Sequence, residues 1–255
     1  MRGNFFYRRL GGRIISERKK QQLSQEQLAL LSEMDRTYLA RIEEGKPIGQ
    51  LIGWVYQGID ATGNRILLNV NGDSVSGKPN IDGADRQIIG NGLPKFLIGF
   101  GNTVTYKNWD LNVFFRGVFG HDLVNTYRSF YEVPSMIGSY NLPKTTADQR
   151  NPETGNLLNS TNGVLCDYYV EKASFVSLDN LALGYNFNVP KTWAFSKIRV
   201  YVAGNRLFTI TKYTGVDPEP RYRDSESGDI LQPGIDRRNT WFRTRSFTIG
   251  ANIVF

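Results

Sequence analysis

The stretch Arg245-Ser246-Phe247-Thr248-Ile249-Gly250-Ala251-Asn252-Ile253-Val254-Phe255 decides how the rest of the chain is interpreted. Successive side chains of a strand point to opposite faces, so this stretch has one apolar face and one small, mostly polar face. In a water-soluble sheet the apolar face would line a core, whereas in a membrane barrel it would face lipid. The apolar face consists of Phe247, Ile249, Ala251, Ile253 and Phe255.

Four earlier segments alternate in the same way, and we expect them to form antiparallel strands with the last one. Short turns are predicted at 106–109 and 190–195, and long polar links at about 120–174 and 213–244. Outer-membrane barrels place short turns at one end and long loops at the other. The expected strands are 96–106, 109–119, about 181–187 after a bulge near Asp179, about 197–212, and the end of the chain.

Residues 11–46 have helical periodicity instead and predict three short helices. Ser24 is a suitable N-cap for the second helix, and Gln27 completes a capping box. Asp35 is expected to cap the third helix and Gly45 to end it. The residues expected to face inward are Leu28, Leu31, Ala29, Leu39 and Ile42.

These helices resemble the Cro/XRE repressor-type helix-turn-helix, whose third helix enters the major groove of DNA. The resemblance implies base contacts from Arg36, Thr37 and Arg41, with Tyr38 on the same outward side. It implies that Gln25 anchors a phosphate at the start of the second helix. The motifs that carry it are Arg13-Ile14-x3-Arg18-Lys19, Leu23-Ser24-Gln25-Glu26-Gln27-Leu28-Ala29 and Tyr38-Leu39-Ala40-Arg41-Ile42-Glu43-Glu44-Gly45-Lys46.

The chain departs from that family in two places. Glu33 stands at the turn where the family often has Gly, and Pro47-Ile48-Gly49 replaces two further helices that close the family's core. The alternative is an amphipathic helical piece that keeps the family's outer face without binding DNA tightly. A local excess of ten Lys and Arg over six Asp and Glu in the first 46 residues suits a polyanion or a solvated basic surface.

Residues 47–255 resemble SusC/RagA-type TonB-dependent outer-membrane transporters. The resemblance implies a parent protein with a plug domain, a TonB-contacting segment and 22 strands. Such proteins pair with a surface lipoprotein and import oligosaccharides or peptides. The motifs are Pro47-Ile48-Gly49-x4-Trp54-Val55-Tyr56-x-Gly58-Ile59, Ile89-Gly90-Asn91-x-Leu93-Pro94-Lys95-Phe96, Leu178-x-Asn180-Leu181-x-Leu183-Gly184-Tyr185, Arg199-Val200-Tyr201-Val202-Ala203-Gly204-Asn205-Arg206-Leu207-Phe208-Thr209 and Gly215-Val216-Asp217-Pro218-Glu219.

Neither catalysis nor a cofactor is predicted. Cys166 is the single cysteine, in a polar stretch, and His121 is the single histidine, so no disulfide, nucleophile pair or metal cluster is indicated. The run Asn69-x-Asn71-x-Asp73 faintly resembles a calcium loop, but a polar outer loop is the stronger interpretation. We therefore expect no enzyme, no metal and no cofactor.

The sequence predicts a mainly β fold: a partial antiparallel transmembrane-type barrel of about five strands with long outer loops, after a small all-α helix-turn-helix. The predicted division is 1–46 and 47–255. The primary interpretation is the C-terminal part of an uptake receptor, inactive alone, with TonB, a surface lipoprotein and membrane lipid as partners. The alternative is a DNA-binding regulator with an inert extension. Residues 1–10 lack an apolar signal core, which predicts a cytoplasmic chain as given, whereas the resemblance implies the outer membrane.

Overall fold

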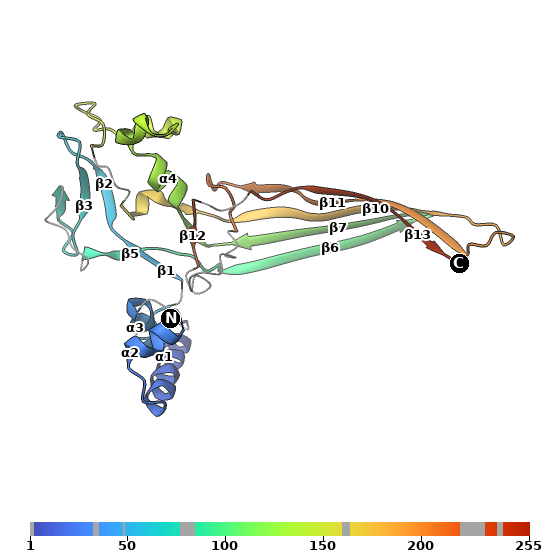
Figure 1. Cartoon of the computed structure of the whole chain (residues 1–255), viewed down its shortest axis with the longest axis horizontal. Coiled ribbons are helices and arrows are strands. Elements are labelled where there is room, and N and C mark those ends of the chain that lie inside the picture. The colour runs from blue at the N-terminus through green and yellow to red at the C-terminus, as the bar shows by residue number, and fades with distance from the viewer. Residues whose placement is uncertain are drawn as a thin grey trace. The chain divides into compact units, whose positions relative to one another are not determined.

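The computed structural model describes residues 3–32, 36–47, 49–76, 85–159, 164–219, 233–238 and 242–255. Its chain divides into two compact units (Figure 1). The first unit comprises Met1–Leu93, Asp122–Glu171 and Glu219–Asn239. The second comprises Pro94–His121, Lys172–Pro218 and Thr240–Phe255.

Three helices, which we call the head, begin the first unit: α1 (Gly3–Lys20), α2 (Gln25–Leu31) and α3 (Arg36–Glu43). Helix α1 begins at Gly3, eight residues before the helical region predicted at 11–46. It crosses α3 at Gly11, where an added Cβ would lie 2.3 Å from the carbonyl oxygen of Ile42. Only a glycine lets the two backbones approach this closely.

The predicted ends of α2 and α3 are confirmed where the structure describes them. The Ser24 hydroxyl accepts a hydrogen bond from the Gln27 amide at 3.1 Å, and the Ser24 amide donates to the Gln27 side chain at 2.7 Å. Gly45 ends α3 in a left-handed conformation, with φ of +75°. The predicted cap Asp35 and the turn residue Glu33 lie outside the described residues.

The core of the head is small. Ala29, Leu39 and Ile42 are buried as expected, and Leu28 is half-buried. The prediction that Leu31 faces inward is wrong, because its side chain is 71% exposed. Ala29 and Leu31 are two positions apart on a helix, so burying Ala29 turns Leu31 to nearly the opposite side.

Three small sheets complete the first unit (Figure 1). Leu67, Cys166 and Tyr169 form a buried core cluster in this unit, so the expectation that Cys166 lies in polar surroundings is wrong. Burial raises the pKa of the Cys166 thiol to about 11. In the first sheet β1 (Gln50–Gly53) pairs with β5 (Gln87–Asn91). In the second, β3 (Arg65–Leu68) lies between β2 (Val55–Ile59) and β4 (Ser74–Ser76). In the third, β8 (Asp122–Asn125) lies between β12 (Ile235–Asp236) and β9 (Val170–Lys172).

Between β8 and β9, the long link contains α4 (Thr126–Tyr131) and three short 3-10 helices: η2 (Pro134–Gly138), η3 (Lys144–Asp148) and η4 (Asp167–Tyr169). Most of the link expected at 120–174, Asp122–Glu171, therefore belongs to the first unit and contains helices and strands where it is described. None of the helices in the described part of the chain is long and apolar enough to cross a membrane.

The second unit is a five-stranded antiparallel sheet, which we call the barrel sheet (Figure 1). Its strands confirm the predicted alternating segments, except that the third begins at Phe175 rather than near Leu181. The register shifts between Leu178 and Asn180, which confirms the bulge at Asp179. The spatial order is β13 (Ser246–Val254), β11 (Lys197–Thr211), β10 (Phe175–Phe187), β7 (Trp109–Phe119) and β6 (Phe96–Tyr106).

The strand register confirms the predicted placement of turns and links. Trp109 pairs with Tyr106 on β6 and with Tyr185 on β10, so the two short turns lie at one end of the sheet. At the other end Phe175 pairs with Thr211. The link at about 120–174 ends just before Phe175, and the link at about 213–244 begins just after Thr211, so both long links lie at this end. Among the described strands, β6 and β13 each have a neighbour on one side only.

Candidate functional site

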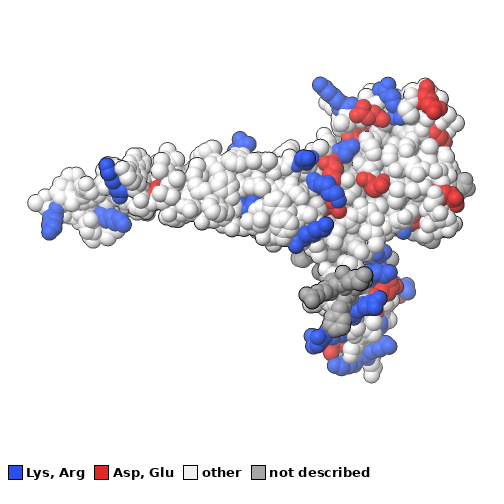
Figure 2. Space-filling model, turned by 180° about the vertical axis from the view of Figure 1, so that it is seen from behind, with Lys and Arg blue, Asp and Glu red and all other residues white. Residues whose placement is uncertain are grey.

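The predicted DNA-contacting residues lie on α3 and at the start of α2. Arg36 is the first residue of α3 and is exposed, while the side chains of Thr37 and Tyr38 lie outside the described part. The Nη2 of Arg41 donates a hydrogen bond to the side-chain oxygen of Gln50 on β1 at 2.8 Å. Figure 2 shows that basic side chains crowd the head, with acidic ones among them.

The structure places Gln25 inside an ion-paired cluster that joins all three helices. Its amide nitrogen donates to Glu43 at 2.7 Å, and Arg18 donates to the same carboxylate at 2.6 and 3.0 Å. The hydrogen bond from Arg18 lowers the pKa of Glu43 against the opposing effect of burial, and Gln25 contributes in the same direction. The role of Gln25 as a phosphate anchor stays a prediction.

The barrel sheet has two chemically different faces. Directly paired residues share a face, so the register places Val104, Leu111, Leu183, Val202 and Ile249 in one apolar row across all five strands. These side chains are exposed or half-buried rather than packed in a core. Charged side chains are sparse along this sheet in Figure 2.

The opposite face is polar and closely fitted. Arg199 donates to Asp110 at 2.9 and 2.5 Å over Gly184, where an added Cβ would lie 2.4 Å from the guanidinium. Farther along, Arg116 pairs with Asp179 at 2.6 Å. Phe114 also lies on this face, over Gly99 and Gly101, although the alternation predicted only small and polar residues there. The two glycines provide the space for its ring.

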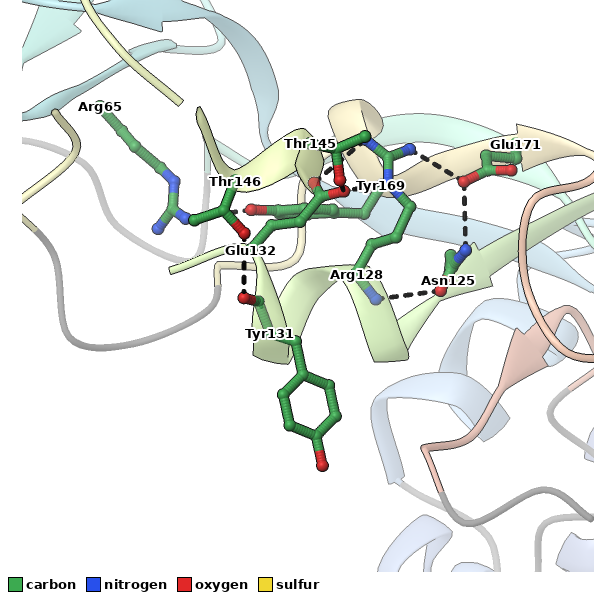
Figure 3. Close-up of polar contacts among 9 residues, drawn as sticks. All are labelled: Arg65, Asn125, Arg128, Tyr131, Glu132, Thr145, Thr146, Tyr169 and Glu171. Carbon is green, nitrogen blue, oxygen red and sulfur yellow. Dashed lines mark hydrogen bonds and ion pairs between the residues drawn. The ribbon is translucent and has the colours of Figure 1, made fainter. Parts of the chain in front are cut away.

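A second buried polar cluster lies between α4 and β9 (Figure 3). Arg128 donates to Glu132 at 2.7 Å and to Glu171 at 2.9 Å, and Asn125 caps α4 by accepting from the Arg128 amide at 3.0 Å. Although burial disfavours its charge, hydrogen bonds to these two carboxylates raise the pKa of Arg128. Thr145 donates to Glu132 at 2.5 Å, so the cluster also anchors η3.

Comparison with known proteins finds relatives both for the head and for the part of the chain that follows it. Residues 14–49 match a family described as helix-turn-helix. TonB-dependent receptor P3 of Formosa agariphila is 31% identical over 238 residues, covering 84% of this chain and 23% of that protein. TonB-dependent receptor SusC of Bacteroides thetaiotaomicron is 28% identical over 207 residues, covering 79% and 19%. The solved RagAB peptide importer in its open-open state superposes with a TM-score of 0.66 at 21% identity, covering 81% and 22%.

This chain joins a Cro/XRE-type helix-turn-helix to a segment related to the SusC/RagA-type TonB-dependent receptors. We call the part after the head the receptor segment. The chain spans about a fifth of the length of the curated relatives. Those relatives are named as receptors rather than enzymes, which agrees with the expectation of a non-enzymatic protein.

The receptor segment carries an aromatic cluster on α4 and the turn that follows. Tyr127, Phe130, Tyr131 and Tyr140 lie with ring centroids 4.6 to 5.6 Å apart, and the Arg238 guanidinium lies 4.0 Å from the Phe130 centroid. The four rings pack on one another, and Tyr127 and Tyr140 are 40% and 43% exposed.

In the polar run Asn69-x-Asn71-x-Asp73, the described residues form hydrogen bonds with one another. The Asn69 side-chain oxygen accepts from the amides of Asn71 and Asp73, at 3.0 and 2.8 Å. Among the residues that are described, no group of three His, Cys, Asp or Glu is placed to hold a metal ion.

Sequence reasoning missed the Arg128 cluster. Arg128 and Glu132 are four positions apart on one helix, a spacing that indicates an ion pair. Glu171, by contrast, is 43 residues away and is brought in by β9. No local pattern marks that contact.

Proposed function

We propose that the receptor segment forms the closing part of an outer-membrane barrel that takes up oligosaccharides or peptides. TonB, a surface lipoprotein and membrane lipid are the partners of the complete receptor. The observation that carries this proposal is the barrel sheet. The apolar side chains of one of its faces are not packed in a core, and the other face is polar and contains ion pairs. An outer-membrane barrel needs such a wall, with lipid outside and water inside.

The open edges of the barrel sheet support a role within a larger barrel. In hydrocarbon, each backbone N–H or C=O without a partner costs several kcal/mol. The edge strands β6 and β13 therefore require further strands before this wall can enter a membrane. We infer that transport belongs to the assembled receptor and that the segment alone is inactive.

A segment exchange tests the proposal. The matching stretch of SusC is replaced by the receptor segment, and the hybrid is assayed for outer-membrane fractionation and for the heat-dependent gel mobility of folded barrels. Two adjacent positions of β10 provide matched variants. Leu183→Arg, on the apolar face, should reduce the stability of the folded barrel by up to about 2–4 kcal/mol, depending on the depth of this position in the membrane. Ala182→Arg, on the polar face, should have far less effect. Equal loss from both variants, or a hybrid that never reaches the membrane, would contradict the proposal.

A second candidate function, DNA binding by the head, is favoured by the exposed Arg36 at the start of α3. We propose that Thr37, Tyr38 and Arg41 join it at the base edges and that Gln25 lies near a phosphate. In a gel-shift titration of the full chain in detergent micelles, Arg36→Ala should cost about 1–3 kcal/mol and relax one base preference. Lys20→Ala, the charge-matched control, should weaken all sequences alike and reduce the salt dependence. No retardation at low salt would eliminate this function.

A further inference from the structure

We propose that Gln50 restrains the DNA-contacting face of the head by holding Arg41 in an intramolecular contact that competes with nucleic acid. The proposal rests on the DNA-binding function proposed above. It concerns a regulatory contact, in which the first strand of the receptor segment keeps the helix-turn-helix in a low-affinity state.

The contact joins two residues whose backbones are held in place, Arg41 and Gln50. Arg41 is half-buried, and its Nη2 lies 2.8 Å from the Gln50 side-chain oxygen. Its backbone is set by the end of α3, where the Lys46 amide donates to the Arg41 carbonyl and the Gly45 amide to the Ile42 carbonyl, both at 2.9 Å. This pair of hydrogen bonds is a Schellman motif, which ends a helix in one defined geometry.

Gln50 is held equally firmly on the other side. It is the first residue of β1 and pairs with Asn91 of β5. Just before it, the Gly49 carbonyl accepts from the Gly92 amide at 2.7 Å, and Gly49 has φ of +82°. Moving Gln50 away from Arg41 therefore means disturbing a paired strand or rotating the glutamine side chain.

The chemistry of the contact imitates base recognition. Arginine reads guanine by donating to its O6 and N7 acceptors in the major groove. The amide oxygen of Gln50 is an acceptor of the same kind, and it occupies one of the donors that Arg41 would use. Binding DNA through Arg41 then requires the loss of this hydrogen bond, which weakens the apparent affinity.

Opposing substitutions at Gln50 test the proposal in the full chain, in detergent micelles, by fluorescence anisotropy with labelled duplex DNA. Gln50→Ala removes the competing acceptor and should tighten binding about twofold to tenfold, the range of one hydrogen bond. Gln50→Glu supplies a charged acceptor and should weaken binding. Gln57→Ala is the matched control and should leave binding unchanged, because Gln57 is an exposed residue of β2 whose side chain contacts Ser74.

A double-mutant cycle separates this contact from other effects. In an Arg41→Ala background, Gln50→Ala should no longer change affinity, because the competing donor is gone. Equal binding by the wild-type, Gln50→Ala and Gln50→Glu chains, while Arg36→Ala still weakens binding, would overturn the restraint and leave the DNA function standing. Absence of binding by every variant, including Gln50→Ala at low salt, would overturn both.

Discussion

Arg18 on α1 and Glu43 on α3 form a two-pronged ion pair across the head, with Nε–Oε1 and Nη2–Oε2 distances of 2.6 and 3.0 Å. The Glu43 side chain is 4% exposed, and Gln25 donates to the same carboxylate. One buried carboxylate thus connects all three helices. The stability of the head should depend on its charge.

The head should lose stability in acid. The hydrogen bond from Arg18 lowers the pKa of Glu43 below its usual 4.5, so the folded head binds fewer protons than the unfolded chain near that pH. The stabilisation is fully present above about pH 4.5 and is lost as the pH falls through the lower pKa of the folded state. Amide hydrogen exchange of α3 followed by mass spectrometry should show this loss in the wild type. Glu43→Gln should flatten the dependence, and an unchanged profile would argue against the ion pair.

The two neighbouring glycines of α1 should respond oppositely to alanine. An added Cβ at Gly11 would lie 2.3 Å from the Ile42 carbonyl oxygen, whereas nothing lies within 4 Å of one at Gly12. Gly11→Ala should therefore push α1 from α3 and cost about 1–3 kcal/mol. Gly12→Ala should gain about 0.5–1 kcal/mol of helix stability. Exchange protection of α1 distinguishes them, and equal effects would refute the close crossing.

Loss of the Arg128 side chain should loosen the link between β8 and β9. Glu132 has a fully buried side chain, so Arg128→Met leaves a buried carboxylate without its cation at a cost of about 3–5 kcal/mol. Limited proteolysis and exchange at α4 report this loosening. Arg150→Met, at an exposed position, is the control. Adding Glu132→Gln should recover part of the loss, and a silent Arg128→Met would contradict the role of the cluster.

The 255-residue polypeptide should aggregate in plain buffer. The apolar face of the barrel sheet leaves side chains such as Phe247 and Ile249 more than 70% exposed, and the edges β6 and β13 can template association between copies. Size-exclusion chromatography with and without detergent decides this. A monodisperse monomer without detergent would show that the face is buried internally and that its assignment to lipid is wrong.

Local pattern alone determined the strands and caps. Alternation places β6 and β7 at the residues predicted, because a two-residue connection at Lys107 and Asn108 leaves one possible register. Ser24 and Gln27 predict their own capping box because both partners lie within four residues. The bulge at Asp179 is visible because the apolar period breaks there. Each of these signals depends on neighbours along the chain.

Tertiary structure alone decided which distant groups meet. Gln25 joins Glu43 because α2 packs against α3, and Leu31 points outward because Ala29 takes the buried side of a short helix. Strand β12 pairs in parallel with β8 across 111 residues, and no periodicity in either segment encodes that choice. Pairing and burial are set by the free energy of the whole fold, in which a contact between distant residues forms only where the intervening chain can bring them together.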